Sequence, residues 1–522
     1  MRNFGEINRA LVAKTKIWLI VLLAVGMIAC TEQNTPTDPG TSTGTDSTET
    51  VTPLDTTITT TDTISITWSG QSADVEGSHT GVEITTENGY VTVNSTVKDI
   101  TYMLSGTGQG QLTIYGTNRH QLILNGLTLT CSDGPAINNQ CKKSCFVVLQ
   151  GTNSLTDGST YATSDEDRKA AFFSEGQMIF SGAGTLTVKG NYKHAIASDD
   201  YIQFTESTGT LNLTSASDGI HANDGVYFDG GIFAITAGND GVQCDSIIII
   251  NDGYIDVLNA TDKGIVDSLG ITINGGTIRV TSKYKCIKTK GDLVINGGDI
   301  QVICTGTSSG GGGGPWGGGA SSSSSPEGIE AKGTITITGG TVYSQSADDA
   351  INSGGDLTIS GGLVCAYSTS NDGIDANGNC YIKGGLIYAI ASRSPEVAID
   401  ANTEGGKKLY VSGGTIVAVG SLESGSSLTQ TCYKASGSTN TWYALVVGSN
   451  VFAFKTPSSN ASTLVVSGAS QPTLYKSVTP SGTAIFNGMG YYPATYSGGS
   501  SVSLSTYSGG NSGGGGGRPG GW

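Results

Sequence analysis

Residues 334–343 read Thr-Ile-Thr-Ile-Thr-Gly-Gly-Thr-Val-Tyr, and they predict how most of the chain folds. Polar and apolar residues alternate on both sides of a glycine pair, which is typical of half-buried β-strands joined by a sharp turn. Glycine suits that turn because it accepts a positive φ. Further glycine pairs begin at Gly230, Gly275, Gly297, Gly361, Gly384 and Gly413. The chain therefore repeats one unit of short strands.

The repeated unit is 22 or 23 residues long, as the steps from Asp218 to Asp240 and from Asp240 to Lys263 show. No helix-length apolar stripe lies between the strands, so the units are not strand–helix–strand crossovers. The remaining arrangement is a parallel β-helix, in which each unit makes one coil and the coils stack about 4.8 Å apart. The sequence thus predicts an all-β fold, a parallel β-helix with β-rich caps at both ends.

The composition excludes several classes of protein. The chain has 522 residues, of which 79 are glycine and only 13% are charged, and its formal net charge is −16. We expect no nucleic-acid partner, because phosphate contacts need clustered cations. The many Ile, Val and Leu residues can bury a large core, which excludes wholesale disorder. The 4 histidines do not favour a histidine-based zinc enzyme.

Residues 1–30 have the features of a targeting segment, and residues 31–62 those of a tether. A cationic start and an apolar run over 17–29 precede Cys30, and this run is shorter than the ~20 residues that a membrane span needs. The run resembles a bacterial lipoprotein signal. We therefore expect a lipid on Cys30 and an outer-membrane lipoprotein of the cell envelope, the alternative being an ordinary secretory signal. Residues 31–62 are rich in threonine and predict an extended tether.

The regions outside the regular repeat predict the remaining organisation. We expect an N-terminal β-rich cap with the first coils over 63–134, the β-helix over 135–421 and a C-terminal β-rich cap over 422–496. Caps are expected because the exposed ends of a β-helix would pair with other chains. A Gly/Ser-rich insertion over 307–326 and a glycine-rich tail over 497–522 are binding elements or flexible extensions. We expect a monomer.

Stacking places equivalent acidic residues in columns with a spacing of about 4.8 Å. Carboxylates at that spacing repel one another and need a compensating cation. Calcium suits such a column because it takes about 6–8 oxygen ligands; the alternative is that the aspartates only shape solvated turns. The candidate ligands form two clusters, namely Asp218, Asp224, Asp240, Asp245, Asp262 and Asp267 in the first, and Asp348, Asp349, Asp372, Asp375 and Asp400 in the second.

Between the two clusters the column turns basic, at Lys263 and Lys285, with Lys288 nearby. These lysines either neutralise Asp240 and Glu327 one coil away or form a cradle for the carboxylate of an acidic sugar. Tyrosines that alternation predicts to point outward are candidates for stacking on sugar rings, namely Tyr343, Tyr367 and Tyr388.

The chain resembles the bacterial β-helix carbohydrate-binding domain proteins, of the clostridial lipoprotein type that binds cellulose and acidic sugars. The resembling stretches are 102–106, 122–127 and 182–188, with the repeated Asp-Gly-Ile coils, over roughly residues 64–460. The resemblance implies a right-handed helix, bound calcium and no catalysis. By position it implies calcium ligands at Asp218, Asp240, Asp245, Asp348, Asp349 and Asp372. This chain departs from that pattern at Lys263 and Lys285, where an unbroken acidic ladder is expected.

These observations predict a surface-tethered, calcium-binding protein that binds an acidic or cellulosic polysaccharide without catalysis. The main alternative is a calcium-dependent polysaccharide lyase on the same fold, with Lys285 or Lys288 as the base beside a calcium-neutralised carboxylate. A third interpretation is a structural adhesin that contacts protein on a neighbouring cell.

Overall fold

The computed structural model describes residues 56–60, 62–307 and 325–509. The predicted signal segment with Cys30, the tether up to residue 55, the interior of the insertion and the end of the tail lie outside the described residues. The described part folds into strands, with one short 3-10 helix at Phe486–Gly488. No described helix is both long and apolar enough to cross a membrane.

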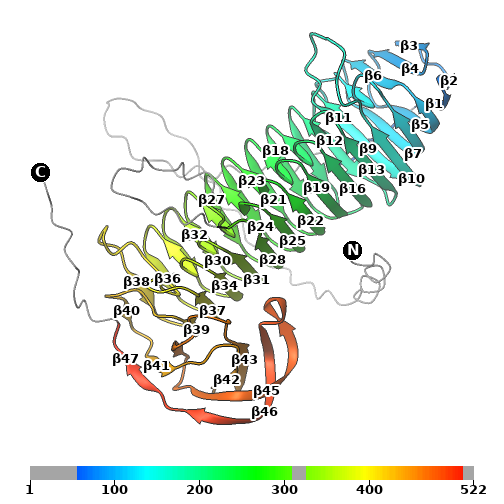
Figure 1. Ribbon diagram of the computed structural model, residues 1–522. Helices are drawn as coiled ribbons and strands as arrows, with labels where there is room; N and C mark the ends of the chain where they lie inside the picture. The colour runs from blue at the N-terminus through cyan, green and yellow to red at the C-terminus, as the bar shows by residue number, and fades with distance from the viewer. Residues whose placement is uncertain (1–55, 61, 308–324, 510–522) are drawn as a thin grey trace, which may run out of the picture. The chain divides into compact units, whose positions relative to one another are not determined.

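Most strands stack in three parallel ladders, which form a parallel β-helix of about 12 coils (Figure 1). This confirms the predicted all-β fold. The first ladder is a 13-stranded sheet of β3 (Val82–Glu87), β4 (Tyr90–Ser95), β6 (Gln111–Gly116), β8 (Ile137–Asn139), β11 (Ala170–Ser174), β14 (His194–Ser198), β17 (Ile220–Ala222), β20 (Val242–Cys244), β23 (Lys263–Asp267), β26 (Lys285–Thr289), β29 (Ile329–Ala331), β32 (Ile351–Ser353) and β35 (Ile374–Ala376).

The other two ladders belong to one large sheet. The second ladder contains β9 (Cys145–Gln150), β12 (Met178–Ser181), β15 (Tyr201–Phe204), β18 (Gly225–Phe228), β21 (Ile247–Ile250), β24 (Gly270–Ile273), β27 (Asp292–Ile295), β30 (Ile335–Ile337), β33 (Leu357–Ile359), β36 (Cys380–Ile382), β38 (Leu409–Val411) and β40 (Ser427–Leu428). The third ladder contains β10 (Thr152–Thr156), β13 (Thr185–Gly190), β16 (Thr210–Ser215), β19 (Ile232–Ala237), β22 (Tyr254–Ala260), β25 (Thr277–Ser282), β28 (Asp299–Cys304), β31 (Thr341–Ser346), β34 (Leu363–Ser368), β37 (Leu386–Ala391) and β39 (Thr415–Val419).

The alternation read from residues 334–343 sets which side chains enter the core. In β30, Ile335 and Ile337 are fully buried, whereas Thr336 between them is half-buried on the outer side. Ile335 pairs with Leu293 in the previous coil and with Leu357 in the next, so apolar side chains stack inside the coils. Gly340 has a φ of +81°, and a Cβ on Gly339 would lie 2.3 Å from the carbonyl oxygen of Asn296. The turn between two ladders therefore requires both glycines.

A ladder of asparagines lines the turn that follows the second ladder. The side-chain amide of Asn251 donates to Asp229 at 2.7 Å, that of Asn274 donates to Asn251 at 2.8 Å, and that of Asn296 donates to Asn274 at 2.9 Å. Each of these side chains thus links one coil to its neighbour through a hydrogen bond.

Replacing Asn274 with alanine is expected to lower the free energy of unfolding by about 1 kcal/mol, because it removes two hydrogen bonds of an exposed side chain. The measurement is the midpoint of a urea titration. Thr272→Ala, on the outer side of β24 in the same coil, is the matched control. An equal shift of the midpoint in both variants would show that the asparagine ladder adds no stability.

The N-terminal strands cover the first coil. β1 (Thr63–Gly70) forms an antiparallel hairpin with β2 (Ser72–Glu76) and pairs in parallel with β5 (Ile100–Gln109). β5 pairs in turn with the long strand β7 (His120–Thr130), which pairs with both β9 and β10. β2 is the outermost strand at this end, and its short length of 5 residues limits pairing with the edges of other sheets.

At the other end, the last strand of the third ladder pairs with an antiparallel strand. β44 (Thr463–Ser467) lies against β39, and β41 (Cys432–Ser436) and β47 (Ser505–Tyr507) follow it. The remaining strands, β42 (Trp442–Val447), β43 (Asn450–Lys455), β45 (Thr473–Ile485) and β46 (Gly490–Val502), form a closed barrel. The cap therefore runs past residue 496. The predicted boundary was too early because the Ser/Gly-rich end of β46 pairs through its backbone, which needs no apolar side chains.

Candidate functional site

The outer face of the 13-stranded sheet carries two columns of mostly polar side chains. The first column, just before or at the start of each strand, contains His194, Asp218, Asp240, Lys263, Lys285, Glu327, Asp349 and Asp372. Lys263 pairs directly with Lys285, and the amide after Asp218, that of Gly219, donates to the carbonyl of Asp240. The predicted stacking of the acidic and basic positions in this column is therefore confirmed.

The second column occupies the central outward position of each strand. It contains His221, Gln243, Val266, Lys288, Glu330, Asn352 and Asp375, and continues through Asp400 to Glu423. The two columns together form one surface, named here the charged face. Its character changes along the coils, from histidines through lysines to carboxylates.

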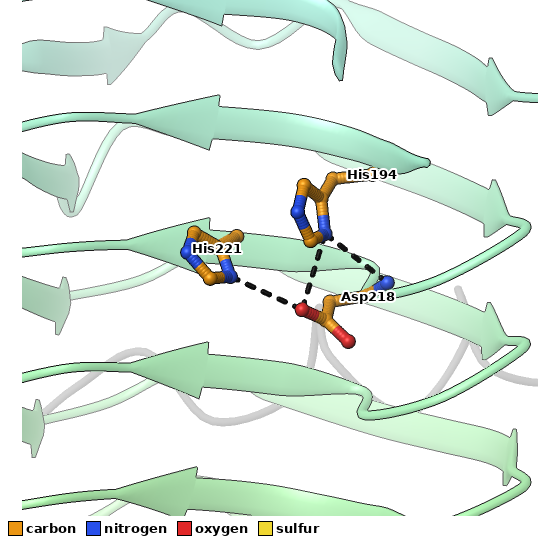
Figure 2. A group of neighbouring side chains, drawn as sticks. All are labelled: His194, Asp218 and His221. Atoms are coloured by element: carbon orange, nitrogen blue, oxygen red, sulfur yellow. Dashed lines mark hydrogen bonds and ion pairs between the residues drawn. The ribbon is translucent and has the colours of Figure 1, made fainter. Parts of the chain in front are cut away.

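The histidine end of the charged face is a compact group (Figure 2). The Nδ1 atoms of His194 and His221 each lie 3.1 Å from Oδ2 of Asp218, and the two rings stack with centroids 4.3 Å apart. Burial by itself raises the pKa of Asp218, but the hydrogen bonds from the two histidines outweigh it and hold that pKa well below its usual value. Burial lowers the pKa of His194. Within the described residues, this is the one group of three metal-ligating side chains whose donor atoms all lie within 4.8 Å of one another.

The middle of the charged face is a buried network of ion pairs. The Nζ atom of Lys285, whose side chain is 0% exposed, lies 2.5 Å from Glu327 and 3.1 Å from Glu330. Lys288 lies 3.4 Å from the same Glu330 carboxylate, and Lys332 also pairs with it. Burial raises the pKa of Glu327, whereas in Glu330 the neighbouring lysines outweigh burial and lower the pKa.

The lysines of the first column therefore neutralise acidic neighbours, as one of the two sequence interpretations held. The Nζ atom of Lys263 lies 3.6 Å from Asp240 and pairs with Asp262, while Lys285 serves Glu327. The alternative, a sugar cradle that includes Lys285, is wrong because this side chain has no exposed surface. Lys288 is half-buried and already paired with Glu330.

The far end of the charged face gathers carboxylates without cations. Burial is the largest cause of a raised pKa in each, and it raises the pKa of Asp375 to about 6, of Asp372 to about 7 and of Asp400 to about 9. The neighbouring carboxyl of Glu423 raises the pKa of Asp400 further, through hydrogen bonding and through its charge. The pKa of Asp349 is raised by burial and then by the charges of its acidic neighbours. In the described part of the chain, no lysine, arginine or histidine forms an ion pair with Asp349, Asp372, Asp375 or Asp400.

Asp348 stands one residue before the first column, where the side-chain amide of Asn371 donates to it at 2.9 Å. Asp349, Asp372 and Asp375 come from neighbouring coils, as predicted for the second cluster. Whether calcium binds there stays a prediction.

The first predicted cluster assembles only in part. Asp218, Asp240 and Asp262 lie together along the first column, whereas Asp224, Asp245 and Asp267 lie at other levels of the coil. Ala222 pairs with Cys244 in the next coil. Asp224 comes two residues after Ala222, whereas Asp245 comes one residue after Cys244, so the two aspartates do not occupy equivalent positions. Asp267 follows the outward Val266 and pairs with Thr289, so its side chain points into the core. A shift of one residue along a strand reverses the direction of the side chain, which explains this error. Asp224 and Asp245 are exposed.

The tyrosines predicted to stack on sugars lie on the third ladder, under the C-terminal barrel. Tyr343 is 3% exposed and Tyr388 is 0% exposed, and the Tyr388 hydroxyl donates to the carbonyl of Lys455 at 2.7 Å. Tyr367 is half-buried against the same apolar cluster. Their outward direction was predicted, but Tyr343 and Tyr388 are not accessible to a sugar, because residues of the barrel cover this face.

Several residues of the charged face were not among the predicted site residues. His194 begins the triplet His-Ala-Ile one unit before Asp218, so its place in the first column was readable from the repeat. His221, Glu330 and Glu423 occupy the second column, and the signal for them was the polar residue that follows each buried isoleucine or leucine, as in Ile220-His221 and Ile329-Glu330.

Comparisons with known proteins give two findings. A model of the family described as carbohydrate-binding domain-containing protein matches residues 87–373, which span most of the charged face. Among solved structures, the polysaccharide lyase-like protein from C. thermocellum, in a gadolinium derivative, aligns with 22% identity and a TM-score of 0.35 over 47% of this chain and 95% of its own. No curated protein matches the chain.

Proposed function

This chain belongs to the family of carbohydrate-binding domain-containing proteins, and from that premise we propose that it binds an acidic polysaccharide, without catalysis, through calcium at the carboxylate end of its charged face. The observation that carries the proposal is the family match, which includes Asp349 and Asp372. The carboxylates beyond the match, Asp375 and Asp400, are half-buried and thus reachable from solvent.

The donor atoms at this end of the charged face suit calcium. All of them are oxygens, the kind of ligand that calcium takes, and no cation of the described chain neutralises them. Asp349, Asp372, Asp375 and Asp400 would hold the ion, which would supply the positive charge that a sugar carboxylate needs to approach an acidic surface. The side-chain amide of Asn352 donates to Asp349 at 3.1 Å and orients that carboxylate.

The state of the lysines supports binding without catalysis. In a lyase, a base must reach the proton next to a uronate carboxylate. Lys285 is buried between two glutamates, and Lys288 is paired with Glu330, so neither candidate base is presented to a glycan. We further propose that a lipid on Cys30 tethers the protein to the bacterial outer membrane, and that residues 31–62 hold the β-helix away from it.

Affinity electrophoresis of the full chain tests this function. Migration through a gel that contains polygalacturonate should be retarded in calcium and not in a calcium chelator, while a neutral cellulose derivative serves as the comparison glycan. The double variant Asp375→Asn/Asp400→Asn should lose at least about tenfold in affinity, which corresponds to about 1.4 kcal/mol. Asp245→Asn is the matched control, because Asp245 is exposed and lies outside the carboxylate end.

Retardation that persists in chelator, or that is unchanged in the double variant, would contradict calcium-mediated binding. The same incubations monitored by ultraviolet absorbance separate binding from lyase activity. A steady rise from unsaturated uronate products would show that the protein is a lyase.

A further inference from the structure

We propose that His194, Asp218 and His221 bind one divalent transition-metal ion of the zinc class, at the opposite end of the charged face from the proposed calcium site. The donor set points to this class. Two imidazole nitrogens with one carboxylate oxygen suit zinc and its neighbours in the first transition series, whereas calcium takes oxygen ligands. Asp218 was predicted from the sequence as a calcium ligand, and its two histidine neighbours change that assignment.

The spacing of the three donor atoms fits such an ion. Both Nδ1 atoms lie 3.1 Å from Oδ2 of Asp218, and all three atoms lie within 4.8 Å of one another. Ligands bound to zinc at about 2.1 Å in a tetrahedral site stand roughly 3.4 Å apart. The donor atoms therefore already stand near the separations of such a site, and the stacked rings must turn to direct both Nδ1 atoms at one ion.

The fold holds the three side chains from two adjacent coils (Figure 2). His194 is the first residue of β14. Asp218 lies two residues before β17, and His221 is the central residue of that strand. The two strands pair through Ile196 and Ile220. The second oxygen of Asp218 accepts hydrogen bonds from the Asn239 side chain at 2.9 Å and the Asp240 amide at 3.1 Å. These bonds orient the carboxylate so that Oδ2 faces the histidines, as partners behind a metal ligand do.

A bound ion would take the place of a ring proton of His194. Its Nδ1 lies 3.1 Å from Oδ2 of Asp218 and 3.3 Å from the backbone nitrogen of Asp218. In the metal-free protein Nδ1 donates a proton to the carboxylate, and an ion held between Nδ1 and Oδ2 replaces that proton. The other ring nitrogen, Nε2, is buried and has no hydrogen-bond partner in the described chain, and it carries the ring proton when Nδ1 binds the ion.

The site is open on one side. The His221 side chain is 14% exposed, whereas those of His194 and Asp218 are 2% and 4% exposed. An ion can therefore enter past His221, and water can complete its coordination. Because the ligands come from neighbouring coils, the bound ion also joins these coils and should raise the unfolding temperature of the full chain.

The test is a titration of the full chain, prepared without a polyhistidine tag, with zinc chloride followed by calorimetry. We expect one ion per chain. His221→Ala should lose more affinity than the roughly 10–100-fold that removal of an outer-shell partner costs, because it removes a direct ligand. His79→Ala, which removes a half-buried histidine outside the group, is the matched control and should bind as the unmodified protein does. Cobalt(II), added in place of zinc, should give the visible absorption of a tetrahedral site.

The absence of stoichiometric zinc binding, or equal binding by His221→Ala and the unmodified protein, would overturn the proposal. Unfolding temperatures measured without metal show whether the variant is folded. If it is not, the cobalt spectrum of the unmodified protein decides, since an octahedral spectrum would contradict the site. Calcium-dependent retardation on polygalacturonate should be the same in His221→Ala, so failure of the zinc site and failure of the proposed function remain distinguishable.

Discussion

Replacing Lys285 with methionine should lower the free energy of unfolding by about 3–5 kcal/mol, because it leaves buried carboxylates without their counter-charge. The Lys285 side chain is fully buried and lies within ion-pair distance of both Glu327 and Glu330. Methionine keeps much of the volume of the side chain but cannot neutralise either glutamate. The measurement is the midpoint of a urea titration that is monitored by circular dichroism.

The matched control for this variant is Lys290→Met, an exposed lysine just after β26 in the same coil. A second variant isolates the cause. Adding Glu327→Gln and Glu330→Gln to Lys285→Met removes the unpaired charges and should restore part of the lost stability. If Lys285→Met shifts the midpoint no more than Lys290→Met does, the buried ion pairs do not stabilise the coil.

Replacing Asp267 with asparagine should stabilise the protein, and more so in alkaline than in acidic buffer. The Asp267 side chain is 1% exposed and points into the core, where burial raises its pKa from 3.8 to about 6. The folded state therefore holds a proton that the unfolded state releases, so stability falls as the pH rises from 3.8 through about 6. At about 1.4 kcal/mol per pKa unit, the substitution should contribute about 2–3 kcal/mol near pH 8 and less near pH 5.

Asparagine can still accept the backbone hydrogen bond that Gly270 donates to Asp267 at 3.1 Å, so the substitution changes mainly the charge. Urea midpoints of both proteins at about pH 5 and about pH 8 give the measurement. Asp245→Asn, which removes an exposed carboxylate one coil away, is the control. An Asp267→Asn variant that is destabilised at both pH values would show that the carboxyl is solvated or paired in solution.

The network around Lys285 and the carboxylate end of the charged face differ in how their negative charge is neutralised. In the network, Glu330 has three lysines nearby, and the protein supplies its own cations. At the carboxylate end, Asp349, Asp372 and Asp375 have none among the described residues, so protons or a bound cation must compensate their charge. This difference along one surface is what separates the structural part of the charged face from the part proposed to bind.

The periodicity of the sequence was sufficient to predict the fold and the residues of the first column. Steps of 22 or 23 residues place Asp218, Asp240 and Lys263 at one register position, and the strand pairings confirm this placement. A parallel β-helix has this property because each coil lies directly on the previous one, so a count along the chain becomes a position in space.

The sequence did not predict correctly where an acidic side chain points when the residue stood outside that register. Asp245 and Asp267 were grouped by their distance from the repeat, yet one is exposed and the other is in the core. The period of a strand is two, so an error of one residue exchanges inside for outside. The histidine group was missed for a related reason, since it needs both columns at once.

Contacts between distant parts of the chain bury the outward tyrosines and pair the charged side chains. Tyr388 points outward as its alternation indicates, but Phe452 and Phe454, more than 60 residues later, pack on its ring. Repetition and alternation are local properties, so the amino-acid order alone reveals the coils and their columns. Access to solvent, closure of the histidine group and the pairing of Lys285 depend on which surfaces meet after folding, and only the three-dimensional arrangement fixes them, because desolvation and charge pairing are set by neighbours in space.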